Sequence, residues 1–167
     1  DLLHTCNELN TLFEESKYIE ASHVLNELSN TAYKEFNAIY SNSYILNYVI
    51  NNNLNKIVEY NIDVKTVIEY GDFNGLDYQT QLLLFDYLIN ISLESCINAI
   101  DIERIIIVKA VKTGNKIILK MTFTNSSIDK LGIENNLRKI LIDQEYSLNV
   151  KRLDRDHVSI LLSFIVK

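Results

Sequence analysis

The amino-acid sequence predicts an α+β protein in which a helical hairpin precedes a set of helices packed on one face of a mixed β-sheet. Two observations support this fold class. Apolar residues recur at helical spacing from residue 2 to residue 58, and the last third of the chain changes to the β-rich runs of strands. The chain contains no proline, so nothing in the sequence forbids long helices.

The composition is that of an ordinary globular protein, with 47% hydrophobic and 23% charged residues. No apolar run approaches the ~20 residues that cross a bilayer, and no signal-peptide pattern opens the chain. We therefore expect a cytoplasmic protein or the cytoplasmic part of a membrane sensor. The net charge of −6 argues against nucleic acid as a partner. Cys6 and Cys96 lie far apart, which fits a reducing compartment rather than a disulfide framework.

The first part of the chain is predicted to form an antiparallel helical hairpin. One apolar stripe runs over residues 2–13, a polar break follows at Glu14–Lys17, and a second stripe runs from Tyr18 to Ile39. Each helix has an apolar face that the hairpin alone cannot cover. We expect two copies to bury these faces in a four-helix bundle, so that the protein is a homodimer through residues 1–41.

Residues 42–167 are predicted to form the α/β sandwich. The elements expected, in chain order, are a helix from Ser43 to about residue 60, a strand at 62–69, a helix from Asp77 to about Ile100, strands at 104–112 and 116–124, a helix at 133–143, and strands at 147–153 and 157–166. Ser43 and Asp77 are residue types that cap helices. Gly114 marks a tight turn between the two strands that flank it.

The most informative short string is Leu93–Asp101, in which Glu94 is followed four residues later by Asn98 and then by Ala99. Residues four apart share a face of a helix, so the two polar side chains are expected to point together into a site. This string and the order of elements resemble the cytoplasmic core of sensor histidine kinases of the quorum-sensing type, over essentially the whole chain. A capping or surface role for the two residues is the alternative.

The resemblance implies a domain of the GHKL ATPase type, with the Bergerat fold, that binds ATP with Mg²⁺. It implies that the amide oxygen of Asn98 holds the Mg²⁺ that bridges the phosphates. It also implies that Glu94 is catalytic, because an acid at this position orients or deprotonates the attacking group.

The sequence departs from this family after residue 123. Where active members carry Asp-x-Gly-x-Gly, Asn125 takes the place of the aspartate that reads adenine, and neither glycine is present. The lid that follows is short, and Gly132 stands alone where the family has Gly-x-Gly for close approach of the phosphates. Lys130 could attract an anion, although a basic cluster on a helix is more often a solvated face. These three residues are the remaining candidates for nucleotide binding in a site that we expect to be degenerate.

A histidine that accepts the phosphoryl group is expected on the first helix. In the family an aspartate directly follows this histidine, so Asp1–His4 fits the segment after it, and the acceptor would precede Asp1. The alternative is that His4 is itself the acceptor, and a third possibility is that the chain carries none. His23 and His157 are expected to be structural or solvated.

Three functions remain open from the sequence. The first is a two-component signalling protein of histidine-kinase type that relays phosphate through a histidine to an aspartate of a response regulator. The second, similar to the sporulation initiation phosphotransferase, is a phosphotransferase or pseudokinase that does not use ATP and docks response regulators. The third is a non-enzymatic dimeric binding module. The missing glycines favour the second, whereas the pairing of Glu94 with Asn98 favours the first.

Overall fold

The computed structural model describes residues 2–25, 27, 41, 43–69, 73, 75–125 and 129–165. The chain divides into two compact units, Asp1–Ile39 and Tyr40–Lys167. The domain boundary predicted between residues 41 and 42 adjoins positions outside the described residues and stays a prediction. Among the helices described, none combines the length and apolarity that crossing a membrane requires.

The first unit contains helix α1 (Leu2–Glu14), a short turn and a second helical stretch over residues 18–25. The turn closes where the Lys17 backbone N–H donates to the Leu12 carbonyl at 2.9 Å, and Ser16 adopts a left-handed backbone with φ of 58°. Both features suit a tight connection between helices. The polar break in the sequence therefore separates two helices, while most of the second predicted stripe lies outside the described residues.

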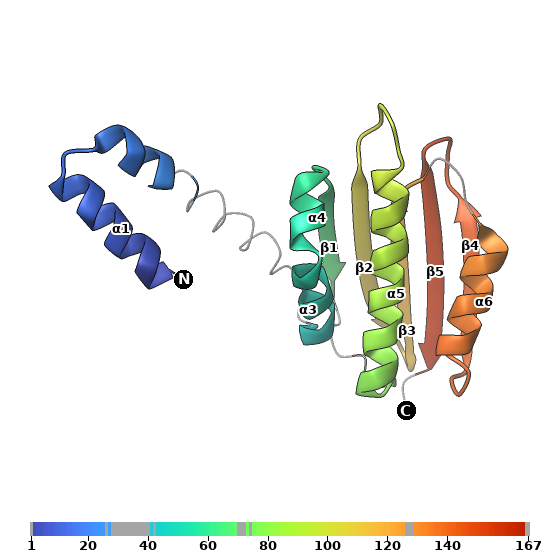
Figure 1. The fold of residues 1–167 in the computed structure, drawn as a ribbon. Coiled ribbons are helices and arrows are strands. Elements are labelled where there is room, and N and C mark those ends of the chain that lie inside the picture. The colour runs from blue at the N-terminus through green and yellow to red at the C-terminus, as the bar shows by residue number, and fades with distance from the viewer. Residues whose placement is uncertain are drawn as a thin grey trace. The chain divides into compact units, whose positions relative to one another are not determined.

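The second unit is a five-stranded mixed sheet with helices on one face (Figure 1). Its elements are α3 (Tyr44–Asn52), α4 (Leu54–Glu59), β1 (Asp63–Ile68), α5 (Tyr78–Ile97), β2 (Ile105–Thr113), β3 (Lys116–Thr124), α6 (Lys130–Ile140), β4 (Tyr146–Arg152) and β5 (His157–Ile165). The strand order is β1-β2-β3-β5-β4. β1 pairs with β2 in parallel, with α5 as the crossover between them, and the other pairs are antiparallel.

The core lies between the sheet and its helices. Alternate residues of β3 are buried, as expected for a strand with one covered face: Ile117, Leu119, Met121 and Phe123. Helix α5 lies against β2 and β3, α3 lies against α5, and α6 covers β4. Phe73 packs edge-on against Phe85 of α5, with ring centroids 5.1 Å apart. The predicted α+β sandwich is confirmed.

The single helix predicted from residue 43 to about 60 is instead two helices, α3 and α4, separated at Asn53. The Asn53 side-chain Nδ2 donates to the Val49 carbonyl at 3.0 Å, and its backbone N–H donates to the Ile50 carbonyl at 3.0 Å. Asparagine competes in this way for backbone partners and interrupts helices. The apolar spacing continues across the break, which is why periodicity alone missed it.

Three other helix boundaries differ from the prediction. Helix α5 ends at Ile97 rather than near Ile100, and beyond its end the Arg104 guanidinium binds the Ala99 carbonyl at 3.0 and 3.3 Å and the Tyr60 carbonyl at 2.9 Å. A guanidinium satisfies carbonyls that a finished helix leaves unpaired. Helix α6 spans Lys130–Ile140, so it begins and ends three residues earlier than the predicted 133–143.

Candidate functional site

The candidate site lies at one end of the sheet, where β3 ends and β5 begins. Thr124 pairs with His157 at this end. The last turn of α5 is tied to the same place, because the Cys96 thiol contacts the Ile105 carbonyl at 3.5 Å and the Thr124 carbonyl at 3.8 Å. Burial raises the pKa of the Cys96 thiol to about 11, so this cysteine packs and does not act as a nucleophile.

Asn125 follows β3 at the centre of this end and is only 5% exposed. Its side-chain Nδ2 donates to the Ser95 hydroxyl of α5, and its backbone N–H donates to the Asp156 carbonyl at 2.8 Å. The side-chain Oδ1 is buried and has no hydrogen-bond partner in the described part of the chain. A buried carbonyl without a donor costs roughly 1–3 kcal/mol, so this oxygen is an acceptor that lacks a partner within the protein.

Asn47 and Ser159 also carry a buried polar atom without a partner among the described residues. An unpaired atom therefore does not by itself identify a site. Asn125 differs from these two residues in its position, because it lies where the ends of α5 and β3 meet the turn before β5. That junction is where the resemblance to histidine kinases predicted a contact with adenine.

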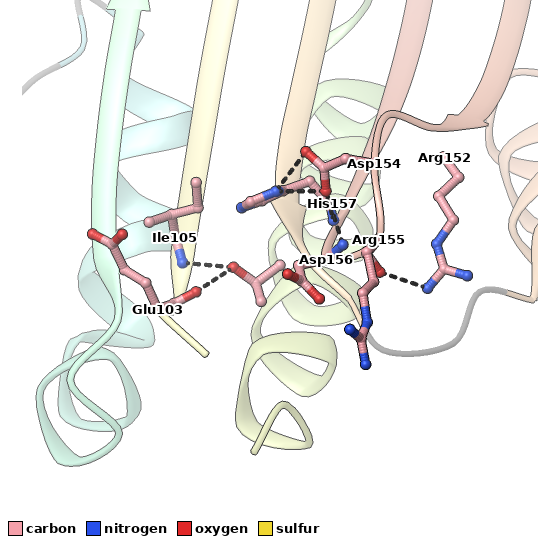
Figure 2. Close-up of polar contacts among 8 residues, drawn as sticks. Glu103, Ile105, Arg152, Asp154, Arg155, Asp156 and His157 are labelled. Carbon is pink, nitrogen blue, oxygen red and sulfur yellow. Dashed lines mark hydrogen bonds and ion pairs between the residues drawn. The ribbon is translucent and has the colours of Figure 1, made fainter. Parts of the chain in front are cut away.

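The Thr124 hydroxyl holds the start of β2 against the end of β3. It donates to the Glu103 carbonyl at 2.8 Å and accepts from the Ile105 backbone N–H at 3.0 Å. In Figure 2 the dashed lines from Glu103 and Ile105 mark these two hydrogen bonds. Thr124 is fully buried, so both bonds are shielded from water. This anchor fixes the backbone immediately before Asn125.

The turn between β4 and β5 is organised by Asp154 (Figure 2). Its Oδ1 accepts from the Asp156 backbone N–H at 2.8 Å, the His157 backbone N–H at 2.9 Å and the His157 ring Nδ1 at 2.9 Å. The hydrogen bond from Asp156, followed by the contacts with His157, lowers the pKa of the Asp154 carboxyl. The turn thereby directs the Asp156 carbonyl at the backbone N–H of Asn125. His157 has a structural part in this arrangement.

Glu94 and Asn98 lie at the end of α5 next to this site. Both side chains are exposed, and Asn98 is the residue that ends the helix, with its backbone N–H bonded to the Glu94 carbonyl at 3.1 Å. Because Asn98 keeps a helical backbone, the four-residue spacing keeps the two side chains on the same side of the last turn. Glu94 immediately precedes Ser95, the hydroxyl partner of Asn125.

Asp129 caps the first turn of α6. Its Oδ1 accepts from the Gly132 backbone N–H at 3.0 Å, and a Cβ added to Gly132 would lie 2.2 Å from Asp129 Oδ2. A side chain at position 132 would therefore displace the Asp129 carboxylate from this position. Lys130, the other candidate in this turn, has its Nζ 3.7 Å from Glu134 Oε1. Both sequence-predicted residues of α6 thus have partners inside the helix.

Sequence reasoning gave no role to Ser95, Thr124 or Asp129. Of these three, Asp129 could have been identified from the sequence, because aspartate just before the start of a helix is a preferred capping residue. His4 is exposed on α1, in the other unit of the chain. Within the residues that the structure describes, no three His, Cys, Asp or Glu side chains form a group that could hold a metal ion. The predicted lid includes residues 126–128, which are outside the described residues.

No protein-family model matches this chain, and no curated protein matches it. Solved structures of histidine kinases do match. The catalytic domain of histidine kinase ThkA aligns with a TM-score of 0.61 at 14% identity, covering 73% of this chain and 90% of that one. The histidine kinase AdeS of Acinetobacter baumannii aligns with a TM-score of 0.62 at 10% identity, covering 94% of this chain and 85% of that one.

A structure of ThkA in complex with the response regulator protein TrrA also matches. It aligns with a TM-score of 0.57 at 13% identity, covering 98% of this chain and 58% of that one. At these identities the likeness establishes the fold and not the chemistry. The α/β unit has the fold of histidine-kinase catalytic domains, as the sequence resemblance predicted.

Proposed function

We propose that this chain, which shares the fold of histidine-kinase catalytic domains, is a two-component signalling protein with a degenerate nucleotide site. In this proposal it relays phosphate through a histidine to an aspartate of a response regulator. The observation that carries the proposal is the unpaired Oδ1 of Asn125, a buried acceptor at the end of β3. The amino group of an adenine is a donor of the right kind for it.

The remaining residues of the site fit a nucleotide in part. ATP with Mg²⁺, when bound, would supply the phosphoryl group. Asn125 would accept from the purine, the amide oxygen of Asn98 would be a ligand for Mg²⁺, and the carboxylate of Glu94 would orient or deprotonate the attacking group. Asn98 and Glu94 are exposed and near the Ser95–Asn125 contact, which is consistent with these roles. Gly132 and Lys130 fit less well, because both have partners within α6.

The helical unit supplies the acceptor and the dimer contacts in this proposal. His4 is exposed on α1 and is the acceptor candidate within the chain, the alternative being a histidine that precedes Asp1. Among the described residues of this unit, four large apolar side chains are also exposed: Phe13, Tyr18, Ile19 and Leu25. Exposed apolar surface of this kind favours association, so we propose a homodimer through residues 1–41. A cytoplasmic location is part of the same proposal.

A titration with a fluorescent ATP analogue, with and without Mg²⁺, tests the nucleotide site. We expect weak, saturable binding whose Mg²⁺-dependent part is lost in Asn98→Ala. Asn90→Ala is the matched control, because Asn90 lies two turns earlier on α5 and its Nδ2 only bonds the Asp86 carbonyl at 2.9 Å. An absence of binding at millimolar nucleotide would reject a kinase that uses ATP.

A second candidate is a phosphotransferase or pseudokinase that does not use ATP and docks response regulators. The specific observation in its favour is the capped first turn of α6. There the Gly132 backbone N–H donates to the Asp129 carboxylate and is therefore not free to bind a phosphate. Transfer of labelled phosphate to His4 from a phosphorylated response regulator, without added ATP, separates the two candidates. Loss of the label in His4→Gln would identify the acceptor.

A further inference from the structure

The sheet of the second unit has one face that helices cover and one that they leave open. The described helices of this unit all lie on the same side of the sheet (Figure 1). Along β3 the residues that face the helices are buried, so Lys116, Lys120 and Thr122, which alternate with them, lie on the other side. The register between the strands assigns the outward residues of the remaining strands in the same way. This second side is the open face of the sheet.

Four lysines form a lysine patch on the open face: Lys109 of β2, Lys116 and Lys120 of β3, and Lys151 of β4. Strands β2, β3, β4 and β5 contain no aspartate or glutamate, although the chain has 22 such residues and a net charge of −6. Strand β1 does contain an acid, but the Lys65 Nζ lies 2.6 Å from Asp63 Oδ2, so this acid is already paired. Positive charge is therefore concentrated on one face of a negatively charged chain.

The lysine patch has no counter-charge in the described part of the chain. None of its four lysines forms an ion pair there, and Lys109 lies directly opposite Lys120 across β2 and β3. Like charges directly opposite one another in a sheet are destabilising. Three strand spacings of about 4.8 Å separate β2 from β4, so the patch is about 15 Å wide across the strands. A cluster of unpaired charge of this kind favours a negatively charged binding partner.

Branched apolar side chains lie among the lysines on the open face. All of them are partly exposed: Ile105, Ile107, Val111, Ile118, Leu161 and Ile165. Leu161, which lies opposite Lys120 across β3 and β5, is 37% exposed. The stem of a lysine can lie along such apolar surface while its ammonium stays in water. The open face thus combines apolar contact area with positive charge, the two contributions that hold a protein at an anionic lipid surface.

The residue types of the open face favour a lipid surface over a protein or a nucleic acid. Protein interfaces are enriched in aromatic residues and arginine and depleted in lysine and serine. The outward residues of the five strands include no tyrosine, phenylalanine, tryptophan or arginine, although the chain has 10 Tyr and 6 Phe. Single-stranded nucleic acid would likewise require aromatic rings on which bases stack. A lysine ammonium lacks the fixed fork of arginine, so it suits a fluid layer of charged headgroups.

We propose that the open face of the sheet docks on a membrane that contains anionic lipids, with the lysine patch against the headgroups. Each lysine close to such a surface strengthens binding about fivefold. Docking through this face does not depend on the proposed nucleotide site, which lies at the end of β3 beside α5.

Sedimentation of the full chain with lipid vesicles tests this proposal. The chain is expected to bind vesicles that contain phosphatidylserine but not vesicles of phosphatidylcholine alone, and to bind more weakly as the salt concentration is raised. Lys109→Gln combined with Lys120→Gln keeps part of each aliphatic stem and removes two charges, so the affinity for anionic vesicles should fall about tenfold or more. Lys116→Gln combined with Lys151→Gln should have the same effect even if the first pair folds poorly.

Lys56→Gln combined with Lys139→Gln is the matched control. It makes the same change in net charge, but the two lysines are exposed on helices α4 and α6. Its affinity for anionic vesicles should stay within about twofold of the wild type. The proposal is wrong if both vesicle types are bound equally, or if neither patch variant binds more weakly than the control. It is also wrong if the lysine patch binds polyglutamate or duplex DNA while anionic vesicles are not bound, because the partner is then a protein or a nucleic acid.

Discussion

Replacing Asn125 by leucine together with Ser95 by alanine is expected to leave the empty protein equally stable or more stable while abolishing purine binding. The double change removes the unpaired Asn125 Oδ1, which costs roughly 1–3 kcal/mol, and the Asn125–Ser95 hydrogen bond, which contributes roughly 0.5–1.5 kcal/mol. Leucine keeps the branch at Cγ, so the change in shape is small. The free energy of unfolding should therefore change by between about −0.5 and +2.5 kcal/mol, where a positive value is stabilising.

Urea unfolding with linear extrapolation measures this change, and adenosine titration of the same samples measures binding. Asn47→Leu is the control, because Asn47 has an equally unpaired Oδ1 but lies on α3 and should not affect binding. A decrease of more than about 1 kcal/mol in the free energy of unfolding of the double variant would contradict the reasoning, because the Asn125 side chain would then stabilise the fold in the absence of a ligand.

Three further outcomes are expected. Inosine, which carries a carbonyl oxygen in place of the adenine amine, should bind at least about tenfold more weakly than adenosine, because it places an acceptor opposite the Asn125 Oδ1; equal affinities in competition titrations would argue against that contact. Leu84→Ala should lower the free energy of unfolding by about 3 kcal/mol, because Leu84 is fully buried in α5; a loss below about 1 kcal/mol in urea would mean that the site collapses around the cavity. Asp154→Asn should lower stability near neutral pH but not in acid. The Asp156 backbone N–H lowers the pKa of the Asp154 carboxyl from 3.8, so its stabilisation is present above that pH and is lost as the pH falls through the lowered pKa. The thermal unfolding midpoints of the wild type and of Asp154→Asn should therefore approach each other as the pH is lowered. A difference between the two midpoints that does not change with pH would show that the charge of Asp154 does not stabilise the fold.

Strands and capped helices were predictable because their signals are local. The predicted strand at 116–124 is β3, and Asp77 caps α5 as its residue type suggested. The errors arose where a single side chain redirected the backbone. Asn53 ends one helix and begins the next inside an unbroken apolar pattern, and Asp129 starts α6 three residues early.

The candidate site was only partly accessible from the sequence. Asn125 could be selected because it stands where a related family carries an adenine-reading aspartate. Ser95 could not be selected as its partner, since thirty residues separate the two and spacing along the chain predicts contacts only within one element. The role of Gly132 is not evident from the sequence either, because it depends on the Asp129 carboxylate, which lies in the space that a side chain at position 132 would take.

The turn between β2 and β3 has a consequence for experiments in which the protein must carry a label. Gly114 has a φ of 61°, and a Cβ at this position would meet no atom within 4 Å. β3 runs from this turn to Asn125, a distance of about 30 Å for a strand of its length. Exposed turn tips tolerate insertions well. A peptide tag or a small fluorescent domain inserted after Gly114 would therefore lie at the far end of the sheet, where it does not enter the site.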